Sequence, residues 1–166
     1  MHFARFLLPL APMLLAACSE RPTQQSDEAA TSGYVIGLGE IMGLNQMRHA
    51  KLWFAGQADN WPLAAYELEE LREGFSDAMR YHAHHKSVPR PLTEMIPEYM
   101  DVPLANLDRV VASRDKAGFI KAYDALTAGC NGCHEEADFG YNVITRPTAP
   151  PYSNQAFEPA GPDGTR

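Results

Sequence analysis

The chain is most constrained by a motif near its C-terminus, Cys130-Asn131-Gly132-Cys133-His134. Two cysteines three positions apart lie almost one turn apart on a helix, because an α-helix has 3.6 residues per turn. The spacing C-x-x-C-H is typical of covalent attachment of a c-type haem. We therefore expect Cys130 and Cys133 to form thioethers to one haem c. We expect His134 to be its proximal iron ligand through Nε2, while Nδ1 donates to an acceptor elsewhere.

Two other uses of the cysteine pair are open at this point. A thioredoxin-like redox pair opens a helix in a βαβ setting, and nothing before Cys130 has the pattern of a strand. A zinc site would need further ligands, and it would leave His134 without a role. The histidines available for such a site are His82, His84 and His85.

The N-terminal residues have the pattern of an export signal. Arg5 provides a positive charge, and an apolar stretch runs from Phe6 to Leu15. An uncleaved membrane anchor is the alternative, but a spanning helix needs roughly 20 apolar residues, and this stretch is shorter and contains two prolines. Export favours haem over the cytosolic uses of a cysteine pair.

The run Leu15-Ala16-Ala17-Cys18 resembles the signal of bacterial lipoproteins. The resemblance implies that residues 1–17 are a signal peptide and that Cys18 receives the lipid. Two or more acyl chains hold a soluble domain stably at a membrane. The expected location is the periplasmic face of a bacterial membrane, and Ser19 favours the outer membrane in this resemblance.

Charge and cysteine content limit the partners. The 14 Lys and Arg residues against 21 Asp and Glu residues give a net charge of −7, which argues against nucleic acid and favours a basic redox partner. All three cysteines belong to the two motifs, so none is left for a structural disulfide.

Apolar residues recur at helical spacing in several segments after a small, polar stretch over residues 18–33, which predicts a flexible tether. The second helix is expected to begin with Asn60 as N-cap and Pro62 in its first turn, and Asp115 is expected to cap the last helix. The predicted order is a helix over about 34–57, a helix to His82, a proline-rich loop over 86–103, a helix from about Pro103, and a helix running into the motif.

This order predicts an all-α, antiparallel four-helix bundle over residues 34–140, followed by an irregular, proline-rich tail over residues 141–166. With C-x-x-C-H at the end of the fourth helix, the chain resembles the class II c-type cytochromes, the family that includes the cytochromes c prime. Members of that family often dimerise, so the resemblance admits a homodimer. The chain departs from it by continuing for 32 residues beyond His134 and by lacking the Arg often found before the distal methionine.

The distal side of the iron is expected on the first helix, whose start lies beside the end of the fourth in an antiparallel bundle. Counting equal rises of 1.5 Å per residue makes Met42 the first candidate, and the family resemblance also puts a methionine there. His49 follows on the same stripe, roughly 10 Å further along, and Met47 comes last because it points off the stripe by about 140°. All three are also plausible core residues.

The distal ligand separates two functions. With Met42 or His49 bound, a low-spin iron suits electron transfer with a periplasmic or membrane partner, and we predict this electron carrier rather than an enzyme. With no sixth ligand, the iron would bind NO or CO in a sensor, carrier or scavenger. The expected aromatic packing partners of the porphyrin are Trp53, Phe54, Trp61 and Tyr123.

Overall fold

Four long helices make up the part of the chain that the computed structural model describes, residues 34–161. They are α1 (Leu38–Gln57), α2 (Trp61–His82), α3 (Leu92–Ala112) and α4 (Lys116–Glu136), and no strand occurs in this range. The predicted all-α four-helix bundle is confirmed. The predicted signal peptide, the tether and Cys18 lie outside the described residues.

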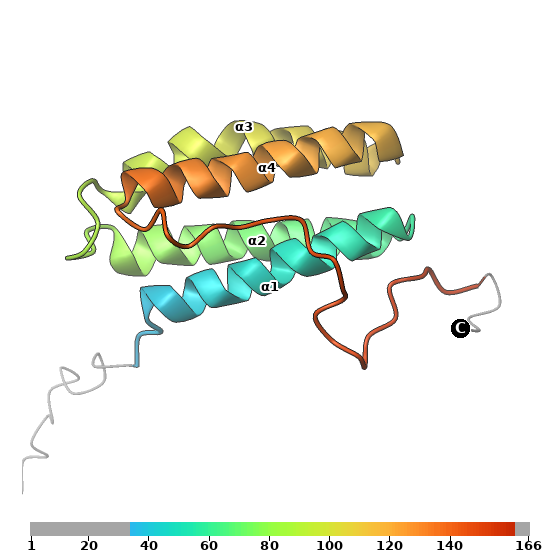
Figure 1. The fold of residues 1–166 in the computed structure, drawn as a ribbon, viewed down its shortest axis with the longest axis horizontal. Coiled ribbons are helices and arrows are strands. Elements are labelled where there is room, and N and C mark those ends of the chain that lie inside the picture. The colour runs from blue at the N-terminus through green and yellow to red at the C-terminus, as the bar shows by residue number, and fades with distance from the viewer. Residues whose placement is uncertain (1–33, 162–166) are drawn as a thin grey trace, which may run out of the picture. The chain divides into compact units, whose positions relative to one another are not determined.

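Consecutive helices run antiparallel and bury their apolar stripes against one another (Figure 1). Burying a leucine or phenylalanine side chain contributes about 1.5–3 kcal/mol, so these stripes are the main stabilising feature of the bundle. The side chains with no exposed surface include Leu52, Leu107, Phe119, Tyr123 and Leu126. None of the helices between residues 34 and 161 has the length and apolar character that crossing a bilayer requires.

Both predicted N-caps are confirmed. The Asn60 side chain accepts a hydrogen bond from the Leu63 N–H (3.3 Å), and Asp115 accepts one from the Gly118 N–H (3.0 Å). Each carboxylate or amide oxygen satisfies a helix N–H that has no partner within the helix. α1 begins at Leu38, four residues later than expected, and its N-cap Gly37 has no side chain to cap it.

Three helices end in the same tight turn, which is built without glycine. The residue after each C-cap has a left-handed backbone, at Asp59 (φ 56°), Arg114 (φ 55°) and Asp138 (φ 64°). The N–H groups of that residue and the next donate back to carbonyls of the last helical turn, which is the Schellman arrangement. At the end of α4 this turn reverses the chain and directs it back along the helix.

The start of α3 corrects the sequence prediction. Residues 86–103 were expected to form a loop that holds at most a short helical turn, with the helix starting near Pro103, whereas α3 starts at Leu92 and contains Pro97 and Pro103. A proline inside a helix removes one backbone hydrogen bond and usually breaks the helix. Here burial compensates for that loss, because α3 buries its apolar residues on both sides of each proline: Met95, Ile96, Met100 and Leu104.

α4 approaches the backbone of α3 closely at the second proline, Pro103. Pro103 has no N–H, so the carbonyl of Tyr99 lacks its usual helical partner. That carbonyl faces Gly129 of α4, where an added Cβ would lie 2.6 Å from the oxygen. Proline on α3 and glycine on α4 therefore allow the two backbones to meet where a longer side chain would separate them.

α1 and α4 are the least closely packed neighbours, since α1 packs mainly on α2 and α3 mainly on α4. The chain after α4, residues 137–161 and here called the C-terminal segment, contains no helix or strand. It runs between α4 and α1 (Figure 1). Phe157 is buried against Phe54, and Asn60 donates to the Phe157 carbonyl (2.9 Å), so the segment is anchored at the far end of α1.

Candidate haem site

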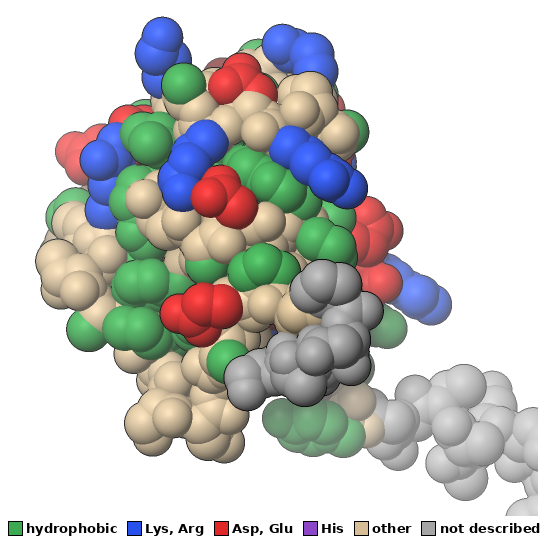
Figure 2. Space-filling model, turned by 90° about the vertical axis from the view of Figure 1, so that its right-hand side faces the viewer, with side chains coloured by type: hydrophobic (Ala, Val, Ile, Leu, Met, Phe, Trp, Pro, Cys, Tyr) green, Lys and Arg blue, Asp and Glu red, His purple; other side chains and the backbone are tan. Residues whose placement is uncertain are grey.

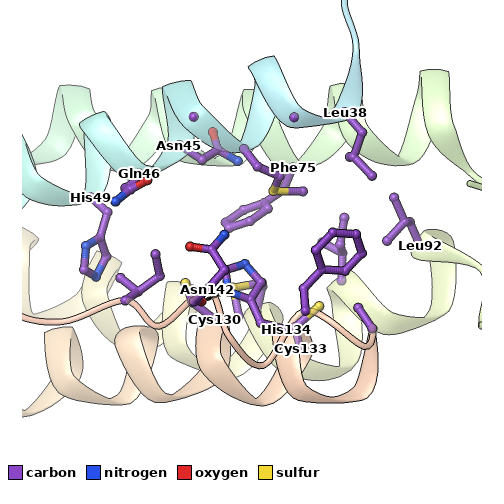
Figure 3. Close-up of a pocket in the computed structure, with 18 of the residues that line it drawn as sticks. Leu38, Asn45, Gln46, His49, Phe75, Leu92, Cys130, Cys133, His134 and Asn142 are labelled. Carbon is purple, nitrogen blue, oxygen red and sulfur yellow. Dashed lines mark hydrogen bonds between the residues drawn. The ribbon is translucent and has the colours of Figure 1, made fainter. Parts of the chain in front are cut away.

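A cavity of about 380 Å³ lies where the start of α1 faces the end of α4 (Figure 3). Its volume falls within the range of small-molecule and cofactor sites, about 300–1,000 Å³. Cys130, Cys133 and His134 line it from α4, and Met42 and His49 line it from α1. The structure thus brings the motif and the first two distal candidates to a single cavity.

His134 is oriented by a hydrogen bond to the C-terminal segment. Its Nδ1 lies 2.6 Å from the backbone carbonyl oxygen of Asn142. A carbonyl oxygen only accepts, so Nδ1 carries the proton and donates, which leaves Nε2 unprotonated. This is the tautomer that a histidine needs in order to bind a metal through Nε2.

The two motif cysteines are free thiols in a site that disfavours their charged form. Burial raises the pKa of Cys130 to about 12, and burial together with the nearby charge of Glu136 raises the pKa of Cys133 to about 11. A thioredoxin-like redox pair works through a cysteine of lowered pKa. The environment of these thiols therefore argues against that alternative.

Two glycines on α1 leave space in the cavity. Gly39 and Gly43 both line it, and a Cβ added at either position would meet no atom within 4 Å. Both positions are exposed, and glycine within a helix is about 1 kcal/mol less favourable than alanine. Since no neighbouring atom would exclude a Cβ, close packing does not require glycine at either position. An open strip on α1 opposite the motif fits a flat, bulky cofactor.

The remaining walls are mostly apolar, as a porphyrin requires. They are formed by side chains of all four helices and of the C-terminal segment, including Leu71, Phe75, Leu92, Ile96, Leu126 and Ile144. The residues present therefore fit a haem, with two thiols and an imidazole on one wall and Met42 among those on another.

The expected aromatic partners of the porphyrin are elsewhere, and that interpretation is wrong. Trp53, Phe54, Trp61 and Tyr123 do not line the cavity. Three of them cluster around the buried ring of Phe119, with centroids 6.0–6.4 Å away, while Phe54 packs in a tilted arrangement on Phe157 of the C-terminal segment. The aromatic side chains that do line the cavity are Phe75 and Phe139.

His49 lies in the wall with both ring nitrogens engaged. Nδ1 is 2.9 Å from the Tyr123 hydroxyl, and Nε2 is 2.9 Å from the Thr127 hydroxyl. Because Thr127 donates its own proton to the Tyr123 carbonyl (2.9 Å), it must accept from His49, so Nε2 carries the proton. Burial lowers the pKa of His49 to about 4, which keeps the ring neutral.

Met47, the third distal candidate, is not among the residues lining the cavity. Its sulfur accepts a hydrogen bond from the Tyr152 hydroxyl of the C-terminal segment (2.7 Å). Sequence reasoning placed Met47 off the stripe of Met42 and His49, and the structure shows that the side chain is used to hold the segment on α1.

Asn45 is a polar residue of the cavity wall that sequence reasoning missed. Its side chain is 5% exposed, and neither amide atom has a hydrogen-bond partner among the described residues. It lies against Gly74 of α2, which has no side chain to displace it. A buried polar group without a partner costs about 1–3 kcal/mol, so the Asn45 amide is available to hydrogen-bond a group in the cavity.

A polar cluster beside the motif was also not foreseen. The Tyr99 hydroxyl donates to Glu136 (2.6 Å), and Arg90 forms ion pairs with Glu136 and with Glu98 (3.0 Å). The hydrogen bonds from Tyr99 and Arg90 lower the pKa of Glu136. The ring of Tyr99 packs on Gly132, where an added Cβ would lie 2.8 Å from it. This cluster docks α3 on the motif.

The histidines at the end of α2 and just after it have different partners. His82 donates from Nε2 to the Ile36 carbonyl (2.8 Å), while His85 lines the cavity and accepts from the Ser87 N–H. Between residues 34 and 161, no three His, Cys, Asp or Glu side chains are grouped so as to hold a metal ion. The tetrahedral zinc site considered from the sequence is therefore not formed in this part of the chain.

Comparison with protein-family models, with curated proteins and with solved structures finds no match to this chain.

Proposed function

We propose that the chain is a c-type cytochrome with one covalent haem, and that it carries electrons at the periplasmic face of a bacterial membrane. The observation that carries the proposal is the cavity in which Cys130, Cys133 and His134 face an α1 wall with Gly39 and Gly43. The motif supplies the attachment chemistry, and the glycines supply space that the polypeptide does not fill.

Bound there, the haem would supply one-electron exchange between ferric and ferrous iron. The residues of the chain divide the other tasks. Cys130 and Cys133 hold the group through their sulfur atoms, and His134 presents Nε2 while the Asn142 carbonyl retains its Nδ1 proton. The apolar walls exclude water from the site. This exclusion affects the reduction potential of the iron and limits solvent reorganisation when the iron changes oxidation state.

Met42 is the distal ligand we propose. It lines the cavity and its thioether has no proton to lose, whereas the proton on Nε2 of His49 is held by Thr127. Ligation by His49 through Nε2 would break its hydrogen bond to Thr127. A methionine ligand raises the reduction potential relative to bis-histidine ligation.

The test is the absorption spectrum of the chain produced with a cytochrome c maturation system. We expect a low-spin ferric spectrum with a methionine-sulfur band that Met42→Ala abolishes. Met47→Ala is the matched control, since it removes a methionine from the same helix outside the cavity lining, and His49→Ala tests the second candidate. A low-spin spectrum that persists in Met42→Ala and is lost in His49→Ala would contradict this assignment.

Binding of a small gas such as NO or CO is the second candidate function, and Asn45 is the observation that favours it. Its unpartnered amide could donate to a ligand bound in the cavity. This function predicts a high-spin spectrum in the wild type and direct binding of CO. Loss of one hydrogen bond of about 1 kcal/mol in Asn45→Leu would speed ligand dissociation about fivefold. A low-spin wild type that binds no CO would exclude this function.

Lipid attachment at Cys18 is the proposed means of membrane association, with residues 19–33 as the tether. The support is the resemblance of residues 15–18 to a lipoprotein signal. We expect labelled palmitate to be incorporated into the wild type and not into Cys18→Ser, with Cys130→Ser as a control that keeps the lipid and loses one thioether. Equal labelling of wild type and Cys18→Ser would refute the anchor.

A basic redox partner is proposed from the charges beside the motif. The exposed acidic side chains there are Glu94, Glu98, Glu135 and Asp138, and Arg90 is their basic neighbour. At the opposite end of the bundle, basic and acidic side chains lie interspersed (Figure 2). We expect electron transfer to a basic soluble cytochrome to slow as salt is added, because opposite charges accelerate encounter. An increase in rate with salt would contradict this docking face.

A further inference from the structure

We propose that Asn131, the residue after the first motif cysteine, is a positioning residue that sets the orientation and tautomer of His134. It does so by clasping the C-terminal segment to α4. The proposal rests on the proposed haem attachment for its effect on the iron, and it gives a role to residues 142–144, which lie outside the motif.

Asn131 makes two hydrogen bonds to one residue of the segment. Its Nδ2 donates to the carbonyl of Ile144 (2.9 Å), and its Oδ1 accepts from the N–H of the same residue (2.8 Å). A reciprocal pair of this kind fixes the position and the direction of the backbone, as a hydrogen-bonded residue pair does between antiparallel strands. The side chain of Ile144 is buried and lines the cavity, so the clasp also closes that wall.

The clasp lies two residues from the acceptor of His134. The chain between them is short and held at both ends. At its start, Asp138 takes the left-handed conformation and Phe139 donates to the His134 carbonyl (2.8 Å). Asn142 then donates to the Phe139 carbonyl (2.8 Å), and its own carbonyl accepts from Nδ1 of His134 (2.6 Å). Without the clasp, the nearest hydrogen bond after Asn142 that ties the segment to α4 would be the one from Arg146 to Asp124.

The bond to the Asn142 carbonyl affects His134 in two ways. It keeps the proton on Nδ1, which leaves Nε2 available, and it makes the imidazole a more basic ligand. A more basic axial ligand stabilises ferric iron relative to ferrous iron, so the clasp is expected to lower the reduction potential.

The C-terminal segment has a second anchor on α4. It allows the effect of Asn131 on His134 to be distinguished from the effect of merely attaching the segment to the helix. Arg146, two residues beyond the clasp, forms a bidentate pair with Asp124 (2.7 and 2.5 Å) and lies 4.9 Å from the ring of Trp53. If the segment needed only to be attached, loss of Arg146 would change His134 as much as loss of Asn131. The clasp predicts that Asn131 alone controls the ring.

The experiment compares Asn131→Ala with Arg146→Gln in the full chain, produced with and without the maturation system. In the haem-free chain, nitrogen-15 NMR reports the His134 tautomer and hydrogen exchange reports the Ile144 N–H. In the haem-loaded chain, a redox titration gives the potential. We expect Asn131→Ala to lose the Nδ1–H preference, to speed exchange at Ile144 and to raise the potential, and we expect Arg146→Gln to leave the tautomer and potential unchanged.

Asn131→Asp keeps the acceptor for the Ile144 N–H and loses the donor, so its exchange rate at Ile144 should be intermediate. The proposal is overturned if Asn131→Ala keeps the wild-type tautomer and potential, or if Arg146→Gln shifts both by as much. A wild type that takes up no haem would refute the proposed attachment, while the tautomer in the haem-free chain would still decide the role of Asn131.

Discussion

Glycines occur at two places near the motif, and they have opposite surroundings. On α4, Gly129 and Gly132 are packed so closely against α3 that an added Cβ would lie 2.6–2.8 Å from atoms of Tyr99 and Met100. On α1, Gly39 and Gly43 face open space in the cavity. The first pair allows α3 and α4 to approach closely. The second pair leaves empty space beside α1.

The difference shows that one end of the bundle combines a closely packed helix interface with an open cavity. The α3–α4 interface is closely packed at the motif, where the Tyr99 ring lies against Gly132 and its hydroxyl donates to Glu136. α1 and α4 pack less closely than the other neighbouring helices, and the C-terminal segment runs between them. The wall that carries the motif is therefore closely packed, while the α1 wall opposite it is open.

Filling the open wall should have the largest effect. Gly43→Leu places a side chain in the proposed haem space, so most of the haem incorporation should be lost. The measurement is the ratio of haem absorbance to protein absorbance after purification. Glu40→Leu is the matched control, because it adds the same side chain to an exposed position one turn away that does not line the cavity. Equal haem content in wild type and Gly43→Leu would show that the haem does not occupy the space beside Gly43.

Filling the tight interface should act on stability instead. In Gly129→Ala the methyl group meets a backbone carbonyl and the Met100 side chain, and we expect the free energy of unfolding to fall by about 1–3 kcal/mol. Urea denaturation of the haem-free chain measures this change. An unchanged midpoint would mean that α3 and α4 are not in close contact there.

The buried His49, which lies in the cavity wall, should make the free energy of unfolding depend on pH. Its folded pKa of about 4 lies below the unfolded value of 6.5, so between these values the unfolded chain binds a proton that the folded chain does not. The contribution of neutral His49 to the free energy of unfolding is therefore fully present above pH 6.5. It falls as the pH approaches 4, and about 2 kcal/mol of it is lost at pH 5.

This dependence is measured as the free energy of unfolding of the haem-free chain at pH 7.5 and pH 5. His49→Gln is the control, since it removes the titrating ring and should lose less stability on acidification. The same loss in both proteins would show that His49 is not the buried group responsible.

The smallest effect is expected from Gly39→Ala in the haem-free chain. An alanine Cβ would meet no atom, and alanine is about 1 kcal/mol more favourable than glycine inside a helix. The unfolding free energy should rise by up to that amount, as followed by circular dichroism. A decrease would indicate that the polypeptide itself occupies this space.

Local sequence signals were sufficient for much of the fold. The caps Asn60 and Asp115 were identified because Asn and Asp at these positions satisfy orphan N–H groups, and the apolar periods of α1, α2 and α4 were clear. The start of α3 was missed because proline is a local signal against helix, whereas its compensation through Met100 and Gly129 is a tertiary contact.

The site was predictable only in part. The motif and the stripe of α1 indicated the residues that face each other, and helix rise placed Met42 near the end of α4. The clasp of Asn131 on Ile144 and the acceptor at Asn142 involve backbone atoms of an irregular segment, which no residue pattern reveals. The two kinds of glycine also look alike in sequence, because only their neighbours distinguish them.

Covalent haem attachment is the central claim, and the intact mass of the purified chain tests it most directly. The chain is produced with the maturation system, denatured and separated on a gel stained for haem, and its mass is then measured. We predict one haem per chain that survives denaturation and is lost in the Cys130→Ser, Cys133→Ser double variant. A wild-type chain with the mass of the polypeptide alone and no haem stain would contradict the account.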